Sequence, residues 1–341
     1  MRRHALRLAV AGAAAGLAAT VHAGPKKQTL VDCTCYDIVR VVPHHRARTV
    51  FKNTGQNLFD VSRDRRRIVY AGTLGRLYVA RIDGKKRRLL DRRRSRWAVF
   101  APDGRYVAYG ADGCRLCLAR TDGSWRRRFR IAGARGPVAW APDSRHLAFV
   151  VSHASATIDR GVLTVARIDG SARRGLTRGR NFEGGTDVGV KMAWSPHGGR
   201  LAYLSGSPTK VHVLRIRTAR QLAVLRGRAP VWSPDGRWLA FSNGFRIAVV
   251  RYDGRRRHLL DPLSVDPYGS GTSWSPGGRW IAFARYSRRE RYQLTLATYD
   301  GRRHRVLTTE SHEVEIGPTY WGRRGRAILY TRLGQRGGSG I

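Results

Sequence analysis

A ten-residue segment that recurs seven times constrains the fold of this chain more than any other sequence feature. Its clearest copy is residues 232–241 (WSPDGRWLAF). Four close copies and two weaker ones stand at 100–109 (FAPDGRYVAY), 140–149 (WAPDSRHLAF), 194–203 (WSPHGGRLAY), 274–283 (WSPGGRWIAF), 61–70 (VSRDRRRIVY) and 321–330 (WGRRGRAILY). Successive copies begin 38 to 54 residues apart. Such a spacing is typical of arrays of one supersecondary unit.

Each copy has the chemistry of a tight turn between two strands. Pro234 presets φ for the turn, Asp235 tolerates the bridge conformation, and Gly236 takes a left-handed one. The segment after the turn alternates large and small apolar residues, as strands do. The copies therefore predict seven strand–turn–strand units.

A companion segment lies between the copies and predicts a second hairpin in each unit. Its forms are 77–84 (LYVARIDG), 116–123 (LCLARTDG), 163–170 (LTVARIDG), 247–254 (IAVVRYDG), 294–301 (LTLATYDG) and, without Asp-Gly, 211–218 (VHVLRIRT). Asp-Gly between alternating strands is a strong hairpin signal. A weaker seventh form, 37–51, bends at Pro43-His44-His45.

The order of the two hairpins predicts how the array closes. The chain begins with a companion hairpin at 37–51 and ends with a turn copy at 321–330. Six units are continuous, and the seventh must combine both ends of the chain, which leaves no open sheet edge. We predict an all-β, seven-bladed β-propeller over residues 37–330, closed by pairing of the N-terminal and C-terminal hairpins.

The WSPDG motif followed by a hydrophobic strand and Asp-Gly resembles the TolB-type β-propeller repeat, a relative of the WD-repeat propellers. The resemblance covers residues 37–330. TolB has six blades and a separate N-terminal domain, so a six-bladed ring is the alternative; this chain has no room for that extra domain. The family includes envelope-complex subunits, protein-binding modules and propellers attached to peptidases or lyases. The resemblance thus implies a fold without fixing an activity.

The N-terminus has the pattern of a signal peptide. Arg2, Arg3 and Arg7 precede an apolar run over 8–21, and Val21-His22-Ala23 is a small-residue cleavage site. An uncleaved anchor is the alternative, but the run is shorter than the ~20 residues that span a bilayer. We expect residues 1–23 to be a signal peptide, 24–36 a lead-in and 331–341 a flexible tail. The mature protein would be periplasmic or extracellular.

The formal net charge of +42 indicates an anionic partner. Basic clusters follow the companion turns, and we predict that they form a polyanion-binding rim on the face that carries both kinds of turn. The rim comprises Lys85, Lys86, Arg87, Arg126, Arg127, Arg128, Arg255, Arg256, Arg257, Arg302 and Arg303. The alternative is a solvated strand edge with arginine favoured by GC-rich coding. We expect anionic cell-surface polymers or acidic lipids; no motif indicates sequence-specific nucleic-acid binding.

Carboxylates gather in the long connections, which we expect on the opposite face. Glu183, Asp187, Asp266, Glu313 and Glu315 form a candidate site for a calcium ion or a basic peptide. The alternative is ordinary loop solvation and pairing with surplus arginine.

Catalysis has little support in the sequence. There is no Gly-x-Ser-x-Gly elbow, and His153, His197, His212 and His312 are isolated. We predict a monomeric, non-catalytic module that binds an envelope protein, a peptide or another ligand. A propeller-type lyase or hydrolase with its active site at the channel mouth is the alternative.

Four cysteines in an exported chain predict two disulfides. Local pairing of Cys33 with Cys35 and of Cys114 with Cys117 is favoured, because the two pairs fall two blades apart. Zinc binding by the four thiolates is the rival, and redox catalysis by the CxxC pair is less supported.

Overall fold

The structure is a computed structural model. It describes residues 34–43, 46–52, 57–129, 131–152, 159–177, 180–182, 192–206, 210–244, 246–260, 271–287, 291–311 and 314–335. The chain divides into a compact unit over Asp32–Ser339 and a second unit of Met1–Val31 with Gly340–Ile341. The second unit, and with it the predicted signal peptide, lies outside the described residues. No helix in the described ranges is long and apolar enough to cross a membrane.

The described secondary structure is 28 strands and one 3-10 turn, η1 (Thr73–Gly75). The first fourteen strands are β1 (Thr34–Val41), β2 (Arg48–Phe51), β3 (Asn57–Val61), β4 (Arg67–Ala71), β5 (Arg76–Arg81), β6 (Arg88–Phe100), β7 (Tyr106–Ala111), β8 (Cys114–Arg120), β9 (Arg126–Arg128), β10 (Ala134–Trp140), β11 (His146–Val151), β12 (Asp159–Arg167), β13 (Arg174–Gly175) and β14 (Arg180–Phe182). The others are β15 (Met192–Trp194), β16 (Arg200–Ser205), β17 (Lys210–Arg215), β18 (Gln221–Arg226), β19 (Arg228–Trp232), β20 (Trp238–Ser242), β21 (Ile247–Arg251), β22 (Arg257–Leu260), β23 (Ser273–Trp274), β24 (Trp280–Tyr286), β25 (Tyr292–Thr298), β26 (His304–Thr309), β27 (Val314–Trp321) and β28 (Ile328–Gln335).

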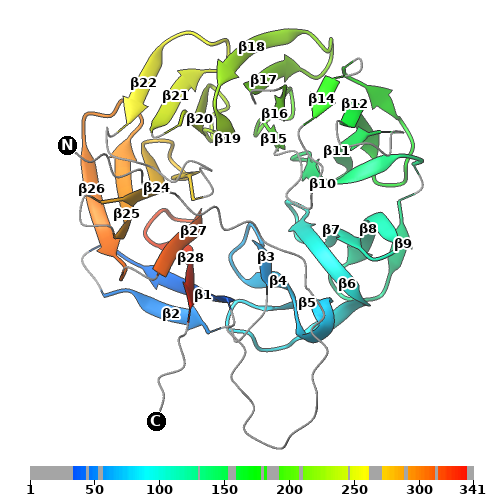
Figure 1. Cartoon of the computed structure of the whole chain (residues 1–341), viewed down its shortest axis with the longest axis horizontal. Coiled ribbons are helices and arrows are strands. Elements are labelled where there is room, and N and C mark those ends of the chain that lie inside the picture. Colours follow the sequence, from blue (N-terminus) through cyan, green and yellow to red (C-terminus); the bar gives the residue numbers. More distant parts are fainter. Residues whose placement is uncertain are drawn as a thin grey trace, which may run out of the picture. The chain divides into compact units, whose positions relative to one another are not determined.

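The strands form seven blades arranged in a ring (Figure 1). Hydrogen bonding groups them into six sheets, one of which has seven strands and contains two blades, because β6 serves both. The first part of β6 pairs with β5 and the second part with β7. In chain order, blade 1 is β3, β4, β5 and early β6; blade 2 is late β6, β7, β8 and β9; blade 3 is β10 to β13, with β14 also paired to β12; blade 4 is β15 to β18; blade 5 is β19 to β22; blade 6 is β23 to β26; and blade 7 is β27, β28, β1 and β2. The predicted all-β propeller with seven blades is confirmed.

Blade 7 contains both ends of the described chain. β1 pairs with β28 in an unbroken antiparallel register from Thr34↔Gln335 to Val41↔Ile328. This confirms the predicted closure by the N-terminal and C-terminal hairpins. Both strands also extend beyond the predicted limits of 37 and 330. Residues 331–335, predicted as part of a tail, belong to β28, where their backbone is held by the ladder with β1 and β27.

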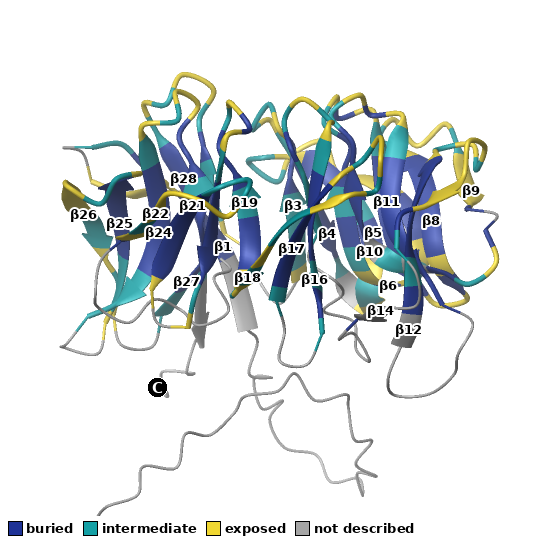
Figure 2. Cartoon of the chain, turned by 90° about the horizontal axis from the view of Figure 1, so that it is seen from above, coloured by how far each residue is buried: buried dark blue, intermediate teal, exposed yellow. Residues whose placement is uncertain are grey.

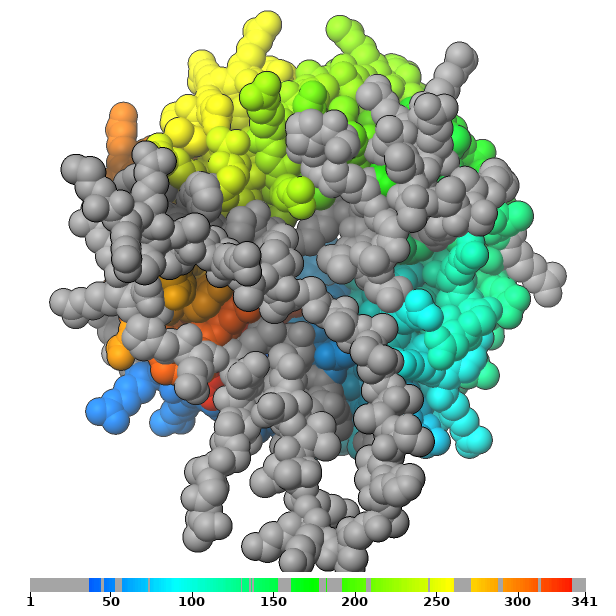
Figure 3. All heavy atoms as spheres, in the orientation of Figure 1, coloured from blue at the N-terminus to red at the C-terminus, as the bar shows by residue number. Residues whose placement is uncertain are grey.

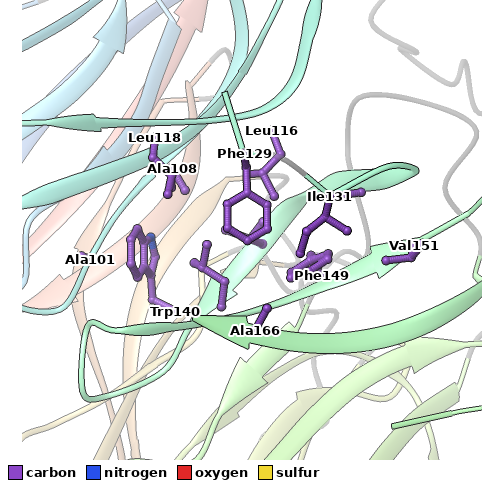
Figure 4. Close-up of a cluster of buried hydrophobic side chains, with 13 residues drawn as sticks. Ala101, Ala108, Leu116, Leu118, Phe129, Ile131, Trp140, Phe149, Val151 and Ala166 are labelled. Carbon is purple, nitrogen blue, oxygen red and sulfur yellow. The ribbon is translucent and has the colours of Figure 1, made fainter. Parts of the chain in front are cut away.

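The apolar core lies between neighbouring blades. Buried side chains form seven clusters in the described part of the chain, one for each junction of the ring. At the junction of blades 2 and 3, Phe129 packs edge-on against Phe149 with 5.4 Å between ring centroids (Figure 4). Middle strands such as β20 are buried on both faces, because a blade is covered by a neighbour on each side. The core residues of one blade are therefore stable only against the next.

Candidate functional site

Both kinds of tight turn lie on one face of the ring, called here the turn face. Within a blade the two turns are joined by a backbone hydrogen bond, as from Tyr252 N to the carbonyl of Arg237 (3.0 Å) in blade 5. Equivalent bonds join Ile82 to Arg66, Thr121 to Arg105, Ile168 to Arg145, Ile216 to Gly199 and Tyr299 to Arg279. Figure 2 shows exposed loops gathered along this face, at the top of that view. The structure thus places the companion turns, and the basic clusters that follow them, on a single face.

All eleven rim residues named from the sequence are exposed. They stand at equivalent positions of four blades, directly after the companion turn or at the start of the outermost strand. The clusters are Lys85, Lys86 and Arg87 in blade 1; Arg126, Arg127 and Arg128 in blade 2; Arg255, Arg256 and Arg257 in blade 5; and Arg302 and Arg303 in blade 6. Figure 3 shows long side chains projecting outward around the circumference of the ring.

Several rim arginines already have intramolecular partners. Arg127 donates from Nη2 to the carbonyl of Ile168 in blade 3 (2.8 Å), and its guanidinium lies 5.3 Å from the ring centroid of Trp125. Arg174 of blade 3, which is not one of the eleven rim residues, makes the equivalent bond to the carbonyl of Ile216 in blade 4 (3.2 Å). These arginines therefore join neighbouring blades, a role that the sequence analysis did not predict. The sequence signal for this role is an arginine five positions after the turn aspartate.

A second group of rim residues has no side-chain hydrogen bond or ion pair to any described residue. This group is Lys85, Lys86, Arg128, Arg255, Arg256 and Arg303. The turn aspartates nearby already accept hydrogen bonds within their own turns. Asp122 accepts from the backbone N and the hydroxyl of Ser124, and these hydrogen bonds hold the pKa of its carboxyl below the usual range. The charge of the second group is therefore available to a partner.

The predicted acidic site cannot be assembled from the described residues. Glu183, Asp187, Asp266 and Glu313 lie outside them. Glu315 lies on β27, where its backbone pairs with Leu333 of β28. Across the described ranges, no group of three or more His, Cys, Asp or Glu side chains could hold a metal ion. The calcium or peptide site in these loops stays a prediction.

The cysteines and histidines are placed as follows. Cys114 and Cys117 form a disulfide within β8. Cys33 and the side chain of Cys35 lie outside the described part of the chain. His212 is buried, with Nδ1 lying 3.1 Å from Gln221 Oε1, and His197 lines a groove between two blades. His153 and His312 are not among the described residues.

That groove, about 700 Å³ in volume, opens on the turn face between blades 3 and 4. Its apolar walls include Val165, Leu176 and Trp194. At its edge, His146 Nδ1 lies 2.6 Å from Asp143 Oδ2. Burial raises the pKa of Asp143, but hydrogen bonds from the Arg145 backbone and from His146 outweigh it and hold this pKa below the usual range. The walls of this groove come from two repeats, so no local sequence pattern predicts it.

Comparison with known proteins supports the fold. No family model matches the sequence, and no curated protein matches it. TolB from Acinetobacter baumannii has a TM-score of 0.46 at 15% identity, over 89% of this chain and 65% of that one, so the chain spans less than two thirds of the TolB chain. A chain of the mitotic checkpoint complex has a TM-score of 0.58 at 14% identity, over 94% of this chain and 99% of that one. The β-propeller domain of Cps50 (Swd1) from Myceliophteria thermophila has a TM-score of 0.52 at 13% identity, over 81% and 99%.

The strand pairing, with the likenesses to the checkpoint-complex chain and to the Cps50 propeller domain, defines the protein as a β-propeller. Its described turn face carries four exposed basic clusters on the outer part of the ring.

Proposed function

We propose that this protein is an exported, non-catalytic binding scaffold whose basic rim engages anionic polymers or surfaces of the cell envelope. The observation that carries the proposal is the placement of the eleven rim residues, which the ring repeats at equivalent positions of four blades. Such an array suits a ligand with many negative charges, because each further contact is made at a high effective concentration. The TolB-like repeat and the signal-peptide pattern agree with an envelope location.

The distribution of partners within the rim supports this proposal. Arg255, Arg256 and Arg303 have no intramolecular ion pair in the described structure, so binding an anion would not break an existing contact. Guanidinium groups also bind phosphate and carboxylate oxygens in pairs. A protein or peptide partner for the long-loop face remains part of the proposal.

The enzyme alternative requires carboxylates and histidines that converge at the channel mouth. In the described ranges, the His–Asp ion pair is Asp143 with His146, and it lines the groove between blades 3 and 4. The described lining of that groove contains no serine, threonine, cysteine, lysine or tyrosine. The binding scaffold is therefore the function that the geometry supports best.

The test compares two variants that remove the same charge. In the rim variant, Arg255, Arg256, Arg302 and Arg303 are changed to Gln. In the matched control, the same change is made at exposed arginines beside the connections of the opposite face, namely Arg76, Arg115, Arg226 and Arg246. Binding of purified protein to teichoic acid, lipopolysaccharide, anionic vesicles and DNA is measured over a salt series.

We expect one class of polymer to bind at near-physiological salt. The rim variant should lose at least about tenfold in affinity and show a shallower salt dependence, because fewer counterions are released. The control should stay within about threefold, since long-range attraction is screened at this salt. An equal loss in both variants would show that net charge alone attracts the polymer, and the rim would not be a site.

A further inference from the structure

A second groove, about 650 Å³ in volume, lies on the circumference between the outermost strands of blades 1 and 2. Its walls are residues 89–93 of β6 and residues 123–126, which contain the companion turn of blade 2 and the start of β9. Arg88 donates to the carbonyl of Asp122 and so joins the two walls. The lining is basic, with Arg92, Arg93 and Arg126 against one carboxylate, Asp91.

The groove lies where β6 bulges against β5 and then continues into blade 2. Leu77 of β5 pairs with Asp91, whereas the next residue, Tyr78, pairs with Leu89. The ladder is therefore irregular on both sides of Leu77, and β6 carries extra residues there. Bulges of this kind bend a strand and redirect its side chains. In β6 the result is a carboxylate that is buried at 1% exposure.

Asp91 holds two guanidinium groups in fixed positions. Arg93 donates from Nη2 to Oδ2 (2.7 Å) and from Nε to Oδ1 (3.2 Å). Arg126 Nη1 lies 3.3 Å from Oδ1, and the buried hydroxyl of Tyr109 donates to Oδ2 (2.7 Å). Burial raises the pKa of Asp91, but the hydrogen bonds from Arg93 and Tyr109 outweigh it and lower this pKa to about 2. The carboxylate is thus charged and its lone pairs are occupied.

The two arginines remain open to solvent on their other sides. The side chains of Arg93 and Arg126 are 36% and 50% exposed, whereas that of Asp91 is 1% exposed. A ligand in the groove would meet guanidinium N–H groups and would not meet the carboxylate. Three arginines against one aspartate leave a local charge of 3 − 1 = +2.

We propose that this groove is a subsite for a single tetrahedral oxyanion, the phosphate or sulfate group of an anionic ligand. The proposal deepens the function proposed above and rests on it for the identity of the larger ligand. Guanidinium groups that approach from two strands fit a group whose oxygens point in several directions, whereas a carboxylate offers two oxygens in one plane. Guanidiniums that are fixed before binding lose little conformational entropy when the ligand arrives.

The first test uses inorganic phosphate, inorganic sulfate and acetate as probes, with titration calorimetry on the mature protein. We expect one phosphate or sulfate per chain and weaker binding of acetate. Arg126→Gln should reduce phosphate affinity about tenfold, the value of one charge-assisted hydrogen bond. Arg115→Gln is the matched control, because Arg115 lies in the same blade, is exposed and is outside both the rim and the groove lining. Equal losses in the two variants would overturn the proposal.

A second variant tests whether phosphate affinity depends on the fixed positions of the two arginines or only on the net charge of the groove. Asp91→Asn makes the groove more positive by one unit, so unspecific attraction predicts tighter phosphate binding. The proposed subsite predicts the opposite, a loss of about tenfold, because the two arginines lose their common anchor. Tyr109→Phe leaves the charge unchanged and should weaken binding about threefold, with the fold checked by near-ultraviolet circular dichroism. If phosphate binds these variants as tightly as the unchanged protein, or more tightly, the subsite is refuted.

Polymer binding distinguishes this proposal from the proposed function. A glycerol-phosphate polymer and a sulfated polysaccharide of similar charge are compared, so that the two sources of oxyanion can be told apart. Phosphate bound one-to-one in the groove, with no polymer bound at physiological salt, would support the subsite and refute the rim. Polymer bound through Arg255, Arg256, Arg302 and Arg303, with no phosphate detected in the groove, would refute the subsite alone.

Discussion

At the scale of the residue, the tryptophan of the repeated turn segment joins five of the seven blades to the blade before them. Its indole Nε1 donates to the carbonyl of the residue that precedes the equivalent position in the previous blade. The bonds run from Trp140 to Val99 (3.3 Å), Trp194 to Ala139 (3.0 Å), Trp232 to Ala193 (2.8 Å), Trp274 to Val231 (3.1 Å) and Trp321 to Ser273 (3.2 Å). The position therefore requires both a large apolar ring and an N–H group.

Trp232→Phe tests this role. The phenyl ring still fills the junction, but the partly buried carbonyl of Ala193 loses this donor. We expect the free energy of unfolding in urea to fall by about 0.5–1.5 kcal/mol, the net value of one hydrogen bond. The control is Trp238→Phe, whose indole has no hydrogen-bond partner among the described residues. Equal losses in the two variants would assign the effect to ring size and not to the hydrogen bond.

At the scale of the element, two junctions lack this tryptophan and use other contacts between strands. Blade 2 has Phe100 at the equivalent position, and its backbone N donates to Asp60 Oδ2 of β3 (2.9 Å). Blade 1 has Val61, and Arg65 donates from Nε to the carbonyl of Trp321 (2.9 Å). Arg65 also lies over the ring of Tyr320, 5.1 Å from its centroid. The two copies of the motif that lack the tryptophan are therefore joined to their neighbours by charged side chains.

Asp60 should make the junction of blades 1 and 2 sensitive to pH. Burial raises its pKa from 3.8 to about 6, and this exceeds the lowering by the N–H groups of Phe100 and Val61 and by Arg65. A carboxyl whose pKa is higher in the folded state stabilises the fold below pH 4, and this contribution is lost as pH rises through 6. We expect the stability of the protein relative to Asp60→Asn to fall by no more than about 3 kcal/mol between pH 4 and pH 7.

Urea unfolding of the unchanged protein and of Asp60→Asn across this pH range measures the difference between their free energies of unfolding. The titration of all other carboxylates cancels in this difference. The Asn variant keeps the size of the side chain and removes only the titration. A difference that is constant with pH would show that Asp60 has an ordinary pKa. The relevant charged neighbour is Arg65, which is unchanged in both proteins.

At the scale of the whole molecule, the repeats predicted the ring but not the grooves. Turn chemistry such as Pro234-Asp235-Gly236 acts within a few residues, so the hairpins, the blade number and the turn face could be predicted from sequence. Asp91 lies between two copies of the motif, in a strand whose register shifts on both sides of Leu77 and which serves two blades. Its partners Tyr109 and Arg126 come from other strands, and their convergence depends on the register of β6. Local patterns do not determine such contacts.

Ring closure can be tested by removing the last strand. Deletion of residues 321–341 removes β28, and with it the ladder that joins β27 to β1. Because each blade is stable only against its neighbours, we expect loss of the cooperative urea transition and most of the free energy of unfolding, about 5–15 kcal/mol for a single domain. The exposed edge of β1 should also promote aggregation.

Deletion of residues 336–341 is the matched control, because it leaves β28 complete. Its unfolding midpoint should equal that of the full chain. A synthetic peptide of residues 321–335, added to the longer deletion, should restore protease resistance, since it supplies β28. If the longer deletion unfolded with an unchanged midpoint and denaturant dependence, the pairing of the two chain ends would contribute nothing to stability, and the ring would hold together through the other six junctions.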